Sequence, residues 1–179
     1  MSAPASYAVG ALVLYGRTGV CRVEGVGTPH FQKNDGRIYY TLRSVFSTCG
    51  ELIYVPVDTA SMRPLIGCEE AAGCLALIPQ LKPEGFHSRK PAELTAHYQE
   101  MLTSCRPKDC LLLIKEIYWK QKSAKKLGQV DARYLKVAER LVCEELAAVL
   151  NTEPESIRKR LYSAIESETP GQKAPSLPA

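Results

Sequence analysis

Short apolar runs alternate with turn sequences in the first part of the chain, a pattern typical of antiparallel strands. Residues 12–15 and 20–26 are apolar runs, separated by a turn with glycine at positions 16 and 19, where a positive φ is allowed. Asn34-Asp35-Gly36 predicts a second turn, and Thr48-Cys49-Gly50 predicts a third. Such short strands bury one face best by curling, so we expect a small SH3-like or Tudor-like antiparallel β-barrel.

After Asp58 the apolar positions recur at helical spacing instead. Leu135, Ala138, Val142 and Leu146 keep one apolar face over the stretch that contains them. The same reading predicts helices at 68–78, 91–104, 107–127 and 131–150, followed by a last helix that begins near residue 152. The second half of the chain therefore predicts an all-helical bundle.

Specific residues mark where these helices should begin. Pro91 and Pro107 suit the first turn of a helix, where the missing N–H has no partner to lose. Asp131 is a natural N-cap, and Thr152 with Glu155 has the spacing of a capping box. These signals place the helix starts more sharply than periodicity alone does.

The predicted fold class is α+β, with a small SH3/Tudor-like antiparallel β-barrel at the N-terminus and an all-α helical bundle domain after it. We expect the β domain over residues 1–62 and the helical domain over residues 63–166. Residues 167–179 are rich in Pro, Ser and Gly, so we expect them to form a disordered tail.

Several function classes lack any local signal in the chain. No apolar run approaches the roughly 20 residues that span a bilayer, and the start has no leader pattern, so we expect a cytoplasmic protein. The seven cysteines are odd in number and lack zinc-site spacing, which favours buried thiols. The histidines adjoin no nucleophile motif, and no glycine-rich phosphate loop is present. We therefore predict a non-enzyme with no cofactor, metal or small-molecule substrate.

Positive charge is concentrated in one stretch of the second half. Residues 1–80 carry six basic and six acidic side chains, whereas residues 106–136 carry nine basic and three acidic ones. On a helical wheel Lys108, Lys115, Trp119, Lys122 and Lys126 lie on one side of the helix expected at 107–127. Lysines at this spacing suit DNA phosphates, although a solvated helix face is an equally simple reading.

A proline-flanked loop offers a second candidate DNA contact. Phe86 lies there with basic neighbours that include Arg89. An apolar ring inserted at a minor-groove step partly unstacks the bases, so Phe86 is a candidate wedge. The alternative is a ring that fills the gap between the two domains. The complete set of expected DNA-binding residues is Phe86, Arg89, Lys115, Trp119, Lys122, Lys125, Lys126 and Arg133.

Several strings of residues occur in a characteristic order along the chain. In the first half they are Tyr15-Gly16-Arg17-Thr18-Gly19-Val20-Cys21-Arg22-Val23, Tyr39-Tyr40-Thr41-Leu42 and Ile53-Tyr54-Val55-Pro56-Val57. In the second half they are residues 111–118, Asp131-Ala132-Arg133-Tyr134 and Ala138-Glu139-Arg140-Leu141. This ordered set resembles the CarD family of transcription regulators, and its second half is similar to Clostridia-type members. The resemblance covers roughly residues 8 to 166.

The resemblance implies a non-catalytic protein that binds RNA polymerase. The family's N-terminal module, shared with transcription-repair coupling factors, pairs an edge strand with the polymerase β subunit, and its helical domain contacts promoter DNA beside the melted region. The positions that match the family's polymerase contacts are Pro29 and Tyr54, with Thr28 and Val55 beside them. The family's wedge tryptophan has no direct counterpart, so Phe86 or the lysines alone would make the DNA contact.

We therefore expect a regulator that binds the polymerase β subunit and promoter DNA and changes the lifetime of the open complex. A protein-interaction module that does not bind DNA is the alternative, and steep salt dependence of DNA binding separates the two. A thiol sensor that depends on Cys105 or Cys110 is a third possibility.

Overall fold

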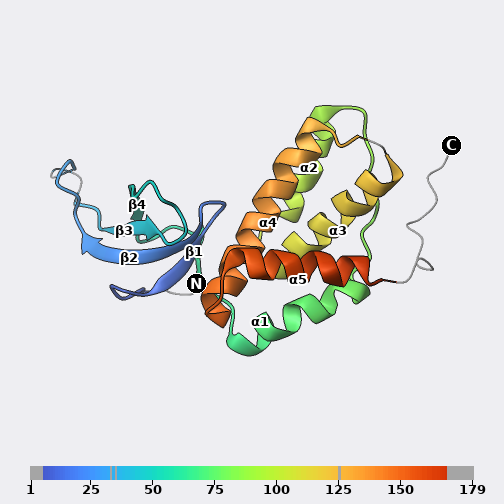
Figure 1. Ribbon diagram of the computed structural model, residues 1–179. Coiled ribbons are helices and arrows are strands. Elements are labelled where there is room, and N and C mark those ends of the chain that lie inside the picture. The colour runs from blue at the N-terminus through green and yellow to red at the C-terminus, as the bar shows by residue number, and fades with distance from the viewer. Residues whose placement is uncertain (1–5, 33, 35, 125, 169–179) are drawn as a thin grey trace. The chain divides into compact units, whose positions relative to one another are not determined.

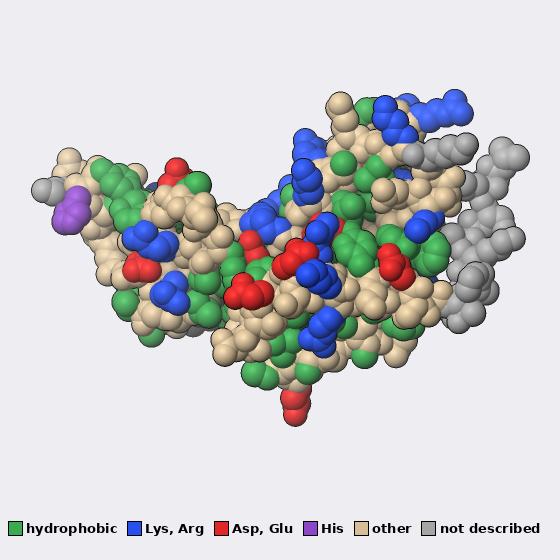
Figure 2. Space-filling view, in the orientation of Figure 1, with side chains coloured by type: hydrophobic (Ala, Val, Ile, Leu, Met, Phe, Trp, Pro, Cys, Tyr) green, Lys and Arg blue, Asp and Glu red, His purple; other side chains and the backbone are tan. Residues whose placement is uncertain are grey.

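The computed structural model describes residues 6–32, 34, 36–124 and 126–168. The chain divides into two compact units, Met1–Ile66 and Gly67–Ala179 (Figure 1). The first unit contains the strands and the second contains the helices, as the change of period predicts. Lys and Arg side chains gather on the helical unit (Figure 2). No helix among the described residues is long and apolar enough to cross a membrane.

The first unit is one antiparallel sheet with the strand order β4-β3-β2-β1-β5. Its strands are β1 (Leu12–Tyr15), β2 (Gly19–Gly27), β3 (Tyr39–Ser44), β4 (Leu52–Pro56) and β5 (Met62–Pro64). The predicted turn between the first two strands is confirmed, because Gly16 and Gly19 have φ values of 44° and 96°. Both glycines adopt a backbone conformation that is strained for other residues.

The expected closed barrel is wrong, because β4 and β5 are two separate edges of the described sheet. Closure needs a ladder between the outermost strands. β5 has only three residues and ends at Pro64, which has no N–H to donate to a further strand. The domain boundary was expected at residue 62. β5 pairs with β1 as far as Pro64, so the sheet extends past that boundary.

The second unit contains five α-helices and one short 3-10 segment among its described residues. Pro91 and Pro107 begin helices as predicted. The elements are α1 (Cys68–Cys74), η1 (Leu75–Gln80), α2 (Pro91–Met101), α3 (Pro107–Ser123), α4 (Gln129–Leu150) and α5 (Pro154–Glu166). Residues 169–179, the main part of the predicted disordered tail, lie outside the described residues.

Two of the predicted helix caps are wrong. Gly128 is the N-cap of α4 and Glu153 is the N-cap of α5, and neither position makes a side-chain capping bond. The Asp131 carboxylate instead accepts a hydrogen bond of 2.6 Å from the Tyr98 hydroxyl. A tertiary partner has therefore replaced the local capping bond that the sequence pattern indicated.

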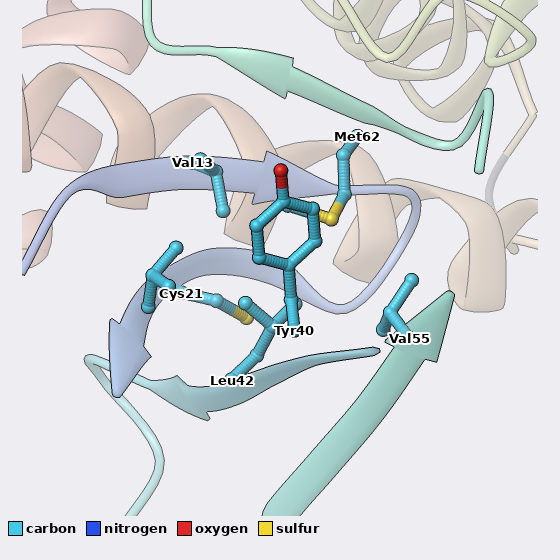
Figure 3. Packing of buried hydrophobic residues seen from close by; sticks show 7 residues of the cluster. Val13, Cys21, Tyr40, Leu42, Val55 and Met62 are labelled. Carbon is cyan, nitrogen blue, oxygen red and sulfur yellow. The ribbon is translucent and has the colours of Figure 1, made fainter. Parts of the chain in front are cut away.

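One face of the sheet holds the core of the first unit (Figure 3). Val13, Cys21, Tyr40, Leu42 and Val55 are buried there, from four different strands. Figure 3 shows these side chains converging together with Met62 of β5. The alternation of strand residues places their neighbours on the opposite face. This alternation decides which side chains of β4 are available for contact.

Candidate functional site

The free edge of β4 is the most distinctive functional feature of the first unit. The backbone N–H of Val57 donates to the carbonyl of Ile38 at 3.1 Å, and the β3–β4 register continues without a shift from there. Hydrogen-bonded pairs alternate in an antiparallel ladder, so Ile53 and Val55 bond to β3. The N–H and C=O groups of Leu52 and Tyr54 consequently point away from β3, toward the open edge.

Apolar side chains accompany these outward backbone groups. Leu52 is 42% exposed, Tyr54 39% and Phe31 65%. The rings of Phe31 and Tyr54 meet edge-on, with centroids 4.9 Å apart and an interplanar angle of 81°. This is a preferred arrangement for an aromatic pair, because the positive ring edge meets the negative ring face. Figure 2 shows hydrophobic side chains exposed together at one end of the first unit.

The four residues expected to contact the polymerase differ in their accessibility. Tyr54 and Thr28 are exposed. Pro29 is buried in the connection between β2 and β3, and Val55 is 1% exposed within the core. The side chains of Pro29 and Val55 are therefore not part of the exposed surface of the first unit. Sequence reasoning missed Phe31, whose only local signal is a large aromatic residue in a polar turn region.

The charged side chain opposite Leu52 in the ladder, Arg43, already has partners. The Arg43 guanidinium donates to the carbonyl of Gly50 at 2.7 Å, and its Nε lies 3.6 Å from the Glu24 carboxylate. Arg43 lies opposite Leu52 in the β3–β4 register. The positive charge nearest to Leu52 in the ladder is thus balanced within the sheet.

Lys115 does not belong to an exposed lysine face, so that prediction is wrong. Its side chain is 4% exposed, and its ammonium donates to the carbonyls of Ile78 and Leu81 at 2.8 Å each. The Glu168 carboxylate lies 2.8 Å from the same ammonium. Ile78 of η1, Leu81 just after it and Glu168, two residues beyond α5, surround the ammonium at this position.

The other predicted DNA-binding cations are exposed. They are Arg89, Lys122, Lys126 and Arg133, and Lys126 lies beyond the end of α3. The Lys122 ammonium lies 5.3 Å from the centre of the Tyr118 ring, which in turn meets the half-buried Trp119 edge-on at 5.5 Å. Lys125 lies outside the described residues. Arg89 lies in the loop before α2, and the other exposed cations of this set lie at the C-terminal end of α3 and the start of α4.

Phe86 is half-buried and packs within the helical unit. Its ring stacks on His97 with centroids 4.3 Å apart and an interplanar angle of 22°. The His97 Nε2 lies 3.0 Å from the buried carboxylate of Glu116 on α3. Burial raises the pKa of Glu116, and the nearby His97 opposes this effect. The ring thus packs within the helical unit, and a wedge role would require it to leave this stack.

A second buried polar cluster joins α2, α3 and α4. The Lys120 ammonium donates to the Tyr98 hydroxyl at 2.8 Å and to the Asp131 carboxylate at 3.0 Å. Burial and the hydrogen bond to Asp131 both raise the pKa of Tyr98. These residues hold three helices in register, which is a structural role that periodicity alone could not reveal.

The cysteines form no metal centre among the described residues, where no group of three potential ligands occurs. All seven are free thiols, of which Cys49 and Cys68 are exposed. Cys105 and Cys110, the candidate sensor residues, are both buried. Exposure therefore favours thiol reactivity at Cys49 and Cys68, and not at Cys105 and Cys110.

Residues 7–66 match the family model described as the CarD-like/TRCF RID domain. The match extends from just before β1 to just after β5, so it covers the whole sheet, including the β4 edge. The first unit is therefore similar to CarD-like modules that interact with RNA polymerase, and the match supports a transcription-related role. The helical unit lies outside the matched residues. A search of curated proteins found no match.

Proposed function

We propose that this protein is a non-catalytic transcription regulator that docks on the β subunit of RNA polymerase through the edge of β4. The observation that carries the proposal is the open edge at Leu52 and Tyr54, within the part of the chain that matches the RID family. Adding a strand to an exposed edge uses backbone hydrogen bonds for affinity. The opposite edge is a poorer site, because β5 is short and ends at Pro64.

The helical unit then contacts promoter DNA through its exposed cations. Lys122, Lys126, Arg89 and Arg133 supply positive charge, and Trp119 precedes Lys122 by three residues on α3. Charge of this kind binds phosphates without reading sequence. A protein held on the polymerase that binds melted promoter DNA better than closed duplex lengthens the life of the open complex. This is the regulatory effect that we propose.

A strand-blocking substitution tests the docking. Leu52→Pro removes an N–H that points away from β3, so it should spare the sheet while preventing partner pairing. Leu52→Thr is the matched control, because it shortens the side chain but keeps the N–H. In a pull-down with purified RNA polymerase β subunit we expect the full chain to bind, Leu52→Thr to bind less strongly because it loses only side-chain contact, and Leu52→Pro to fail. No binding by the unmodified chain would overturn the proposal.

The alternative is a polymerase-binding or other protein-interaction module whose helical unit does not contact DNA. The observation that favours it is that two side chains expected from the sequence to contact DNA instead pack inside the helical unit. Lys115 is buried, and Phe86 is stacked on His97. DNA affinity that shows no steep loss with salt would support this alternative.

A further inference from the structure

Exposed large hydrophobic side chains are concentrated in the first unit. Among the described residues with substantial exposure they are Val9, Val26, Phe31, Ile38, Val45, Leu52 and Tyr54. All of them precede Gly67, where the larger helical unit begins. Grouped apolar surface on a soluble domain commonly marks a binding site. The sheet unit therefore carries the exposed apolar surface that a partner would cover.

Three of these side chains lie together beside the free edge of β4. Leu52 and Tyr54 are two residues apart on one strand, so their side chains share a face of the sheet. Phe31 extends this face through its edge-on contact with Tyr54. The three side chains, which we call the edge strip, stand next to the outward backbone groups that a docked strand would use.

A docked strand must match the edge strip at alternate positions. Residues that lie directly opposite Leu52 and Tyr54 project their side chains to the same face of the extended sheet. A carboxylate at either position would lose water beside apolar groups. The nearest cation of the ladder, Arg43, already lies beside Glu24. Aliphatic or aromatic side chains at these two positions fit without that cost.

We propose that Phe31 and Tyr54 determine specificity by selecting a partner strand with apolar side chains at two alternate positions. The proposal rests on the proposed function, and its partner is the β-subunit strand that docks on β4. Where backbone pairing supplies affinity for many strands, the edge strip supplies discrimination between them. The contact is apolar, so its strength depends little on salt.

Titration of the full chain with purified RNA polymerase β subunit tests this proposal. Phe31→Ser and Tyr54→Thr should each weaken binding at least about tenfold, as central aromatic contacts commonly do. Val9→Ser is the control, because Val9 is as exposed as Phe31, at 65%, but precedes β1. It should change the affinity less than about twofold. Circular dichroism should show all three variants folded, since each position is exposed.

Two outcomes would overturn the specificity proposal alone. One is an unmodified chain that binds the β subunit while Phe31→Ser and Tyr54→Thr bind equally well. The other is binding that falls steeply as salt rises, which would indicate charge pairing instead. If the unmodified chain does not bind at all, the proposed function itself fails, so the two failures are distinguishable.

Discussion

The ammonium of Lys115 on α3 and the carboxylate of Glu168, two residues beyond α5, form a buried ion pair at 2.8 Å. Two backbone carbonyls, of Ile78 and Leu81, accept hydrogen bonds from the same ammonium. A buried charge is tolerated when its hydrogen-bonding capacity is satisfied in this way. Lys115 therefore links three segments of the helical unit and stabilises its fold.

Removing the Lys115 side chain should destabilise the protein strongly. Lys115→Ala leaves a buried carboxylate and two carbonyls without their partner, so the free energy of unfolding should fall by about 3–5 kcal/mol. Lys122→Ala, at an exposed position of the same helix, should change it by less than about 0.5 kcal/mol. Urea unfolding measures both. Equal effects of the two substitutions would contradict the buried link.

The contribution of Glu116 to stability should depend on pH. Burial raises the pKa of this carboxyl above its usual 4.5, so the folded protein retains the proton more readily than the unfolded chain does. The stability that this group contributes is present below the unfolded pKa and is lost as pH rises through the folded pKa. Glu116→Gln should therefore gain in stability relative to the natural protein as pH rises above about 4.5.

Urea unfolding of both proteins at a series of pH values checks this sign. Glu166→Gln, at an exposed position of α5, is the control and should show no such trend. The measured quantity is the difference in free energy of unfolding between Glu116→Gln and the natural protein. The account is ruled out if this difference stays constant with pH, or if it favours the natural protein at higher pH.

The local sequence pattern predicts the strands and helices, but it does not predict how they assemble. Alternating apolar residues and the glycines at 16 and 19 are enough to predict the first hairpin, because the turn conformation is a property of those residues. Whether β4 pairs with β5 depends on the path of the whole chain, so local sequence patterns could not predict whether the barrel closes. Lys115 and Phe31 illustrate the same limit for the sites. A helical wheel or a turn pattern cannot show which distant segment covers a side chain.

Thiol reactivity should divide the cysteines into two groups. Burial raises the pKa of Cys74 to about 11 and of Cys143 to about 12, so neither forms much thiolate near neutral pH. Cys49 and Cys68 are exposed and should react first with a thiol reagent at pH 8. Mass spectrometry of the native protein should find these two modified, and all seven after unfolding. Rapid labelling of Cys105 or Cys110 would revive the thiol-sensor hypothesis.

DNA binding should depend on the exposed cations at the end of α3 and the start of α4. Replacing Lys122, Lys126 and Arg133 together by Gln should weaken duplex binding and reduce the slope of log affinity against log salt by about 2–3, if each contacts one phosphate. Lys159→Gln, on the exposed side of α5, is the control. Fluorescence anisotropy over a salt series measures the slopes. An unchanged slope in the triple variant would favour the module that does not bind DNA.

Amide hydrogen exchange of β4 tests the docking most directly, because the strand's amides alternate in direction. In the free chain the N–H groups of Ile53 and Val55 bond to β3 and should exchange slowly, whereas those of Leu52 and Tyr54 point outward and should exchange fast. Adding RNA polymerase β subunit should slow exchange at Leu52 and Tyr54 selectively, since the new strand bonds to them. Unchanged fast exchange at both amides in a saturated complex would contradict docking by β4.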